Sequence, residues 1–283
     1  MIVLKKALEG KIALVAGSSR GAGRAIALEL GFAGAIVYAT GRSITGQSTN
    51  NWKGTIDDTA VEINASGGTC IPVKCDHRND LEVEELISMI RRQQGRLDIL
   101  VNNVWGGSEY MLDQEKPFWE RSLKNWDTMF TGGIRAQIVT NKYAIPLLRE
   151  NGEGLIIHTT FWDDNKYTGF FYYDLAKNAI NRMVYGLSIE LMNDRTTVVA
   201  VSPGWMRTEL VLAAYNADES NWRDIADLKN TESPHYVGRA VAALAADRNA
   251  FSKTGKVLRV SDLAKEYGFT DIDGRQPDAF HLA

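Results

Sequence analysis

A short apolar run that breaks into a glycine-rich turn does most to constrain this fold. The run Ile12 to Ala16 is too short for a buried helix and has the composition of a strand covered on both faces. Gly17, Gly21 and Gly23 follow, and apolar residues then recur every four positions along one helix face. Unpaired N–H groups and the helix dipole make such a helix start a binding site for anions. The stretch therefore predicts a strand, a turn and a helix that bind a pyrophosphate.

The glycine spacing Gly-x-x-x-Gly-x-Gly is weak by itself, because a strand-to-helix turn rich in small residues also produces it. The rest of the chain supports the nucleotide interpretation, since strand and helix patterns alternate throughout. We expect strands at 12–16, 35–40, 69–75, 97–101, 154–160, 197–201 and 257–260, and helices from 21 and at 56–65, 80–93, 125–150, 173–193 and 234–246. Long loops separate some of them at 43–53 and 104–122.

This alternation predicts one α/β domain over residues 1–283, a Rossmann-like, doubly wound parallel sheet of about seven strands with helices on both faces. Within it, residues 205–230 are expected to form a substrate cap and residues 261–283 a C-terminal extension. In the helix at 80–93 we expect Leu81, Leu86, Ile87 and Ile90 to face the core. Gly132 and Gly133 weaken the middle of the long helix at 125–150.

Composition excludes several classes of function. The chain has 283 residues, 45% of them hydrophobic, and a net charge of −3, so it can bury a core but offers no basic surface for nucleic acid. No apolar run is long enough for a membrane span and no leader peptide is recognised, so we expect a cytoplasmic protein. Cys70 and Cys75 should point to opposite faces of one strand, without a disulfide. The four histidines lack metal-ligand spacing, so no metal site is expected.

Candidate catalytic residues lie after the buried strand at 154–160. Tyr173 and Lys177 are four residues apart at the start of a helix, so their side chains share one face. Ligands of open parallel sheets bind beyond the carboxyl ends of the strands, where this helix begins. The motifs follow one another over roughly residues 8 to 210, in the order Gly17/Gly21/Gly23, Asp76, Asn102-Asn103, Thr160, Tyr173/Lys177, Pro203-Gly204 and Thr208. In this order they resemble the short-chain dehydrogenase/reductase family.

The resemblance implies an oxidoreductase that transfers hydride between a nicotinamide cofactor and a carbonyl or alcohol. Tyr173 would exchange a proton with the substrate oxygen, and Thr160 would polarise that oxygen. A free phenol has a pKa of about 10, so the ammonium of Lys177 would have to lower it by roughly 3 units, worth about 4 kcal/mol. Lys177 would also hold the nicotinamide ribose.

Two arginines indicate which nicotinamide cofactor is used. The second strand ends in Gly41-Arg42, where NAD-dependent members carry an acidic residue for the ribose hydroxyl, and Arg20 lies in the glycine turn. Two guanidinium groups suit a 2′-phosphate, which predicts NADP(H), although either arginine could instead be a solvated surface charge. The residues expected to contact the cofactor are Gly17, Ser19, Arg20, Gly21, Gly23, Arg42, Asp76, His77, Asn102, Lys177, Pro203, Gly204 and Thr208.

Several residues depart from the family pattern. Thr160 stands where serine is usual, Val104-Trp105 replaces a small Ala-Gly pair, and Gly133 replaces an asparagine that completes a proton relay. Either water fills the space beside Gly133 or turnover is slower. These departures leave open a second hypothesis, a nucleotide-binding sensor or scaffold that has lost turnover. The retention of Tyr173, Lys177 and a hydroxyl at position 160 favours the enzyme.

The remaining expectations concern substrate and assembly. Aromatic and apolar residues gather in the loops beyond the strand ends and favour a bulky apolar carbonyl or alcohol: Trp105, Phe161, Trp162, Tyr167, Phe170, Trp205, Met206 and Tyr215. The resemblance also implies a homodimer or homotetramer formed through the two long helices at 125–150 and 173–193.

Overall fold

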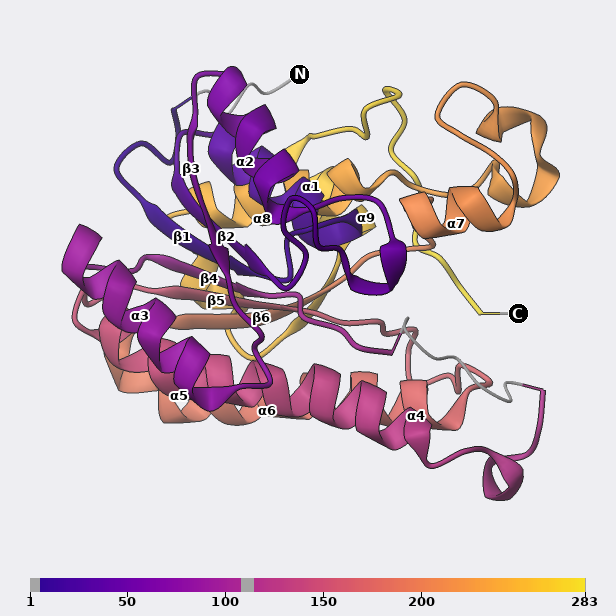
Figure 1. Ribbon diagram of the computed structural model, residues 1–283, viewed down its shortest axis with the longest axis horizontal. Helices are drawn as coiled ribbons and strands as arrows, with labels where there is room; N and C mark the ends of the chain where they lie inside the picture. The colour runs from indigo at the N-terminus through magenta and orange to yellow at the C-terminus, as the bar shows by residue number, and fades with distance from the viewer. Residues whose placement is uncertain (1–5, 108–114, 283) are drawn as a thin grey trace.

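The computed structural model describes residues 6–107 and 115–282, and they surround one parallel sheet (Figure 1). The seven strands lie in the order β3-β2-β1-β4-β5-β6-β7, with every neighbouring pair parallel. Their bounds are β1 (Ile12–Ala16), β2 (Ile36–Gly41), β3 (Thr69–Lys74), β4 (Ile99–Asn102), β5 (Leu155–Thr159), β6 (Thr197–Ser202) and β7 (Val257–Arg259). The predicted Rossmann-like parallel sheet is confirmed.

Helices cover both faces of the sheet (Figure 1). One layer holds α1 (Gly21–Phe32), α2 (Ile56–Ala65), α8 (Pro234–Ala246) and α9 (Val260–Tyr267); the other holds α3 (Asp80–Gln94), α5 (Ala136–Arg149) and α6 (Phe171–Glu190). Two apolar clusters lie against the two faces, because successive residues of each buried strand point to opposite sides. Val15 joins the cluster under α1 and α8, whereas its neighbour Leu14 joins the cluster under α3 and α5.

The strand order determines where a ligand can bind. The chain moves outward from β1 to β2 and β3, then returns to β4 on the other side of β1. The connections that leave β1 and β4 therefore diverge, which opens a crevice at the carboxyl ends of these strands. The glycine turn follows β1, and Asn103 and Trp105 follow β4, so both predicted motifs lie at this crevice.

The long predicted helix is continuous but not regular. It begins as α4 (Lys124–Trp126), continues as the π-helical segment η3 (Asp127–Arg135) and ends as α5. The segment η3 contains Gly132 and Gly133, where weak helix propensity was predicted. A Cβ on Gly132 would lie 3.2 Å from the Cα of Gly106, so the loop after β4 packs directly on the helix backbone.

One core assignment in α3 was wrong. Leu81 is 74% exposed, whereas Leu86, Ile87 and Ile90 are buried as predicted. The buried stripe begins at Val83, and Leu81 is two residues earlier, about 200° away around the helix. The side chain of Asn79 instead caps the helix by accepting a hydrogen bond from the Leu81 amide at 3.1 Å.

The loops beyond the strand ends carry short helices. The loop at 43–53 contains η1 (Thr49–Asn51), and the region at 205–230 contains α7 (Glu209–Ala214), η5 (Trp222–Asp224) and η6 (Ala226–Leu228). The predicted loop at 104–122 includes positions 108–114, which lie outside the described residues. Among residues 6–107 and 115–282, none of the helices combines the length and apolar character that a membrane span requires.

Candidate active site

The glycine turn is packed too closely to accept larger side chains. A Cβ on Gly23 would overlap the carbonyl oxygen of Gly17 and the side-chain amide of Asn103. Gly17 has φ of +83°, a left-handed conformation that favours glycine, and a Cβ there would lie 3.1 Å from the backbone of Val104. The Asn103 amide donates to the Gly17 carbonyl at 2.9 Å, which ties the turn to the end of β4.

The start of α1 already accepts an anionic group. The Gly21 amide donates to a carboxylate oxygen of Glu209 in α7 at 3.0 Å. Thr208, which caps α7, lies against the same turn, since its methyl group would be 3.6 Å from a Cβ on Gly21. The structure thus brings Thr208, one of the residues expected to contact the cofactor, to the glycine turn. The carboxylate occupies the kind of position in which a helix start binds a phosphate oxygen.

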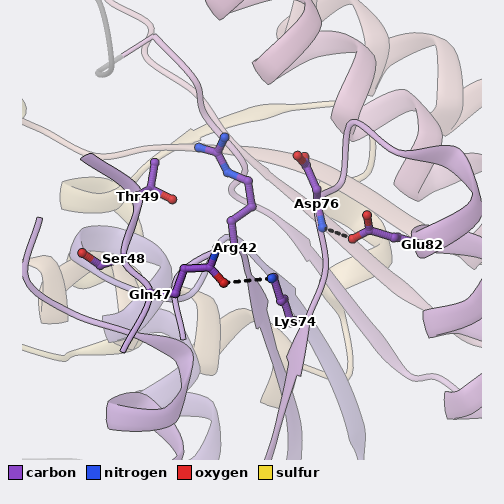
Figure 2. Close-up of a pocket in the computed structure, with 7 residues that line it drawn as sticks. All are labelled: Arg42, Gln47, Ser48, Thr49, Lys74, Asp76 and Glu82. Atoms are coloured by element: carbon purple, nitrogen blue, oxygen red, sulfur yellow. Dashed lines mark hydrogen bonds between the residues drawn. The ribbon is translucent and has the colours of Figure 1, made fainter. Parts of the chain in front are cut away.

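A pocket of about 280 Å³ lies at the carboxyl ends of β2 and β3 (Figure 2). Its lining residues are Arg42, Gln47, Ser48, Thr49, Lys74, Asp76 and Glu82. The side chain of Arg42 extends between Thr49 and Asp76, and the Lys74 ammonium donates to the Gln47 side chain at 3.1 Å (Figure 2). The pocket therefore presents two cationic side chains, two hydroxyl side chains and the carboxylates of Asp76 and Glu82 to a ligand.

Arg20 has a different place from the one expected. Its guanidinium donates to the carbonyl groups of Trp52, Lys53 and Gly54 at 3.4, 2.9 and 3.0 Å, and to the Ser43 hydroxyl at 3.0 Å. Arg20 thus holds the loop after β2 over the glycine turn, and the second cation of the pocket is Lys74. Sequence reasoning missed Lys74, although its position at the end of a strand beside β2 was a usable signal.

Asp76 and His77 follow β3 and have distinct surroundings. The Asp76 carboxylate lines the pocket and accepts hydrogen bonds from the Arg78 guanidinium at 2.6 to 3.1 Å, which outweigh partial burial and lower its pKa. The His77 ring lies in the core between the hydroxyls of Thr40 and Thr140, 2.8 Å from each. Burial lowers the pKa of His77 to about 4, so its ring is neutral and its side chain has a structural role.

Asn102 points away from the crevice. Its fully buried amide donates to the Asn141 side chain of α5 at 2.8 Å, so only its backbone can face a cofactor. Asn141 contacts His158 of β5, whose Nδ1 lies 2.7 Å from Gln137 Oε1. Burial lowers the pKa of His158 to about 3. The Gln137 amide then donates to the Val104 carbonyl at 3.1 Å, and sequence reasoning missed this network.

Tyr173 and Lys177 lie on the first turns of α6, as predicted, with aromatic neighbours. The Lys177 ammonium is 3.9 Å from the centre of the Trp105 ring and 5.5 Å from the centre of the Tyr173 ring. Trp105 and Tyr173 meet edge to face with their centres 5.7 Å apart, and Phe161 lies 6.3 Å from Tyr173. The indole of Trp105 therefore lies against both members of the pair.

Burial shifts the pKa values of Tyr173 and Lys177 so that both side chains favour their uncharged forms. It lowers the pKa of Lys177 to about 7, because desolvation disfavours the ammonium. It raises the pKa of Tyr173, and the nearby carboxylate of Asp174 adds to that rise. The expectation that Lys177 lowers the tyrosine pKa is therefore not met by these shifts, since desolvation dominates here.

The Thr160 hydroxyl faces α6. It donates to the Asn181 side chain at 2.8 Å and lies 3.2 Å from the Lys177 carbonyl, and the side chain is buried. In this rotamer its hydrogen is directed to α6. A rotation about χ1 would turn the hydroxyl, and β-branching limits the alternatives.

The eight expected pocket residues separate into different environments. Trp105 and Phe161 contact Tyr173, whereas Trp205 and Tyr215 pack with each other in the cap and Phe170 belongs to a small core cluster. Of the others, Tyr167 is largely exposed, Met206 packs against the main core and Trp162 lies under the guanidinium of Arg259.

The C-terminal segment crosses the carboxyl ends of β5 and β6. Phe280 lies 6.2 Å from Phe161 and packs over Gly204, where a Cβ would be 3.3 Å from that of Phe280. Its neighbours are held by the buried carboxylate of Asp163, which binds the His281 ring at 2.7 Å and the Leu282 amide at 2.8 Å. These contacts had no signal in the sequence, because a carboxylate 118 residues from its partner leaves no local pattern.

Gly204 also packs against the buried side chain of Glu232. A Cβ on Gly204 would lie 2.8 Å from a carboxylate oxygen of Glu232. Burial raises the pKa of Glu232 to about 8, so the group is largely protonated at neutral pH. Pro203-Gly204 thus lies between Glu232 and the C-terminal segment.

Comparison with known proteins agrees with this arrangement. The family described as Enoyl-(Acyl carrier protein) reductase matches residues 16–262. Dehydrogenase/reductase SDR family member 1 of Mus musculus is 36% identical over 276 residues, 95% of this chain and 85% of its own length. A 7alpha-hydroxysteroid dehydrogenase of Clostridium sardiniense is 26% identical over 258 residues, 90% of this chain and 94% of its own.

The fold is also found among solved structures. A short chain dehydrogenase of Mycobacterium thermoresistibile superposes with a TM-score of 0.81 at 24% identity, covering 98% of this chain and 95% of that one. With the sheet order, the glycine turn and the Tyr173/Lys177 pair, these matches identify the chain as a member of the short-chain dehydrogenase/reductase family of oxidoreductases.

Proposed function

We propose that this protein reduces a bulky apolar carbonyl compound with NADPH, in a reaction that is reversible as an alcohol oxidation. The observation that carries the proposal is the convergence of three features at one sheet edge. These are the glycine turn, the pocket lined by Arg42 and Lys74, and the Tyr173/Lys177 pair at the start of α6. Ligands of this sheet topology bind at that edge.

The glycine turn and the pocket fit a dinucleotide phosphate. The Gly21 amide, which binds the Glu209 carboxylate, would bind a pyrophosphate oxygen in its place. Arg42 and Lys74, with the hydroxyls of Ser48 and Thr49, would bind a 2′-phosphate. Asp76 would contact the adenosine end of the cofactor.

The remaining predicted contacts complete this assignment. The pyrophosphate would lie against Gly17, Ser19 and Gly23. Arg20 would support the loop after β2 above it. The backbone at His77 and at Asn102 would face the cofactor. Lys177, Pro203, Gly204 and Thr208 would flank its nicotinamide half. When bound, the cofactor supplies the hydride.

Tyr173 would act as the proton donor. Its raised pKa keeps the phenol protonated at neutral pH, which is the form that an acid needs during carbonyl reduction. Lys177, with a pKa of about 7, is partly protonated at that pH, and its ammonium would stabilise the phenolate left after proton transfer. Thr160 would orient the substrate oxygen after its hydroxyl turns from Asn181.

The walls around Tyr173 support an apolar substrate. Phe161 and Trp105 both contact the ring of Tyr173, and Phe280 contacts Phe161 in turn. The relative named as a 7alpha-hydroxysteroid dehydrogenase is consistent with a large hydrophobic substrate, which we infer for this chain as well. Residues 205–230 would act as a cap over this space. The whole chain would fold as one domain.

A homodimer or homotetramer would cover the outer face of the two long helices. Ile138 of α5 and Tyr185 and Ile189 of α6 are 47–55% exposed, although they are large and apolar. Exposed apolar patches on a soluble protein mark interaction sites. Sedimentation of the full chain measures its mass in solution and tests this assembly.

The proposed activity is tested by a screen of aryl ketones, steroid ketones and quinones with NADPH and NADH. We expect oxidation of NADPH with a higher specificity constant than that of NADH, and higher values for the bulky ketones than for small polar aldehydes. A preference for NADH, or for small aldehydes, would contradict the proposal. Tight NADPH binding without oxidation by any substrate would instead favour the sensor or scaffold.

A further inference from the structure

Trp105 occupies a position between the helix η3 and the catalytic pair. The centre of its indole ring lies 3.9 Å from the Lys177 ammonium, and the ring forms an edge-to-face pair with Tyr173. Lys177 is only 8% exposed, so this ring takes the place of much of the water that would otherwise surround the charge. The side chain that touches both groups thus comes from the loop after β4, outside α6.

Two glycines make room for the indole. A Cβ on Gly133 would lie 3.0 Å from Cε3 and Cζ3 of Trp105, and a Cβ on Gly107 would lie 2.6 Å from Cε2 and Cζ2. A larger residue at either position would displace the ring. The space beside Gly133, where the family carries an asparagine side chain, is therefore filled by the indole of Trp105.

The loop that carries Trp105 is held on both sides of this residue. The Val104 carbonyl accepts a hydrogen bond from Gln137 at 3.1 Å, and Gln137 is fixed in turn by His158. On the other side, Gly106 approaches the helix so closely that a Cβ there would be 2.5 Å from the Thr128 carbonyl oxygen. The indole is thus preorganised by the backbone.

We propose that Trp105 is a positioning residue whose indole face holds the Lys177 ammonium beside Tyr173, in the space left by Gly133. The inference rests on the proposed function of Tyr173 and Lys177. An ammonium over an indole face is attracted by the ring electrons, and the attraction is strongest where water is excluded. In the part of the chain that the structure describes, the groups found against the ammonium are the uncharged rings of Trp105 and Tyr173, and Asp174 is the charged group that acts on Tyr173.

The test measures the pKa of Lys177 in the full chain without cofactor, from the pH dependence of its acetylation by acetic anhydride read by mass spectrometry. Trp105→Phe keeps a ring face and should leave the pKa close to about 7. Trp105→Leu keeps the site dry but removes the ring, and should lower the pKa by about one unit. Trp105→Gly admits water and should raise the pKa of Lys177 toward the ordinary lysine value of 10.5.

Trp119→Leu is the matched control, because Trp119 is 76% exposed in η2 (Phe118–Glu120), and it should leave the pKa of Lys177 unchanged. Equal pKa values in the Phe and Leu variants of Trp105 would overturn the inference, since a purely packing role does not distinguish them. This titration requires no turnover. It therefore remains informative if the screen of ketones shows no activity, a result that would contradict the proposed function alone.

A second test uses the shared space. Gly133→Asn should displace the indole and lower kcat by about tenfold or more. Removing the indole as well, in Trp105→Gly with Gly133→Asn, should recover part of that loss, so that the double variant is more active than Gly133→Asn alone. Losses that simply multiply would show that the two positions act independently and would contradict the inference.

Discussion

At the scale of single residues, the charge at position 42 determines the expected choice of cofactor. Arg42 follows β2 directly and lines the pocket with Lys74, where an acidic residue would repel a 2′-phosphate. Asp76 and Glu82 also line the pocket, but the Asp76 carboxylate is paired with Arg78. The net arrangement favours a phosphate near Arg42 rather than a bare ribose.

Arg42→Ala should lower kcat/KM for NADPH by about 10- to 100-fold and leave the value for NADH within about threefold, because a charged hydrogen bond to phosphate is worth roughly 1.5–3 kcal/mol. Steady-state kinetics with both cofactors measures the difference. Arg91→Ala, which removes an exposed ion pair with Glu150, is the control. An equal loss of kcat/KM with both cofactors would mean that Arg42 supports the fold of the pocket and does not bind the 2′-phosphate.

The residues of the site were predictable where a local pattern marks them. Tyr173 and Lys177 were found from a four-residue spacing beside a buried strand, and both lie on the expected helix face. Trp105 was noted as a departure from a small pair and as one of the expected pocket aromatics, but its contact with Lys177 was not predicted. Its contact with Lys177 depends on the backbone of Gly133, which is distant in sequence and becomes a neighbour only when η3 packs against the loop after β4.

At the scale of elements, the glycine turn joins β1, α1 and the loop after β4. Gly23 packs against Gly17 and Asn103, and Asn103 also accepts a hydrogen bond from the Thr159 hydroxyl at the end of β5 at 3.0 Å. The close packing at Gly23 therefore fixes the start of α1 against the end of β1 and, through Asn103, against the ends of β4 and β5. A side chain there would separate them.

Gly23→Ala should reduce the free energy of unfolding by about 1–3 kcal/mol and weaken NADPH binding, because the new methyl group overlaps backbone atoms. Gly186→Ala in α6 is the matched control. A Cβ there has no described atom within 4 Å, and alanine should stabilise the helix by up to about 1 kcal/mol. Urea unfolding and cofactor titration measure both effects; similar stability changes in the two variants would contradict this account of the turn.

Most elements followed from hydrophobic periodicity. The helices at 56–65 and 234–246 were predicted with the bounds that the structure shows. In the structure Thr55 caps the first, and Pro234 begins the second. The π-helical character of η3 could not be predicted from Gly132 and Gly133 alone. Weak helix propensity permits such a distortion, and packing against Gly106 accompanies it.

At the scale of the whole molecule, the doubly wound parallel sheet and the covering of both its faces were predicted, whereas the path of the C-terminal segment was not. Alternating strands and helices restrict the topology to a few arrangements. The segment that brings Phe280 to Phe161 is held by single contacts to Asp163, and these have no periodicity. Long-range polar contacts of this kind appear only in the structure.

Two neutral histidines in the core link the stability of the whole molecule to pH. The pKa of His77 falls from 6.5 to about 4 on burial, so between these values the unfolded chain binds a proton that the folded chain does not. The free energy of unfolding therefore decreases as the pH falls from 6.5, by up to about 1.4 kcal/mol per pH unit from this residue. His158 acts in the same direction.

His77→Gln should remove the contribution of this residue. Urea unfolding of the variant and of the wild type at pH 6.5 and about pH 5 gives the two slopes. We expect the variant to lose less stability over this interval, whatever its stability at the higher pH. Identical slopes would show that His77 is protonated in the folded protein as readily as in the unfolded chain.

The central claim is that the phenol of Tyr173 gives the proton that completes carbonyl reduction. It is tested most directly by single-turnover oxidation of NADPH by wild type and Tyr173→Phe, with the ketone that the wild type reduces fastest. We predict that the variant binds NADPH within about threefold of the wild type but oxidises it at least about a hundredfold more slowly. Oxidation of NADPH by Tyr173→Phe at the wild-type rate would contradict the account.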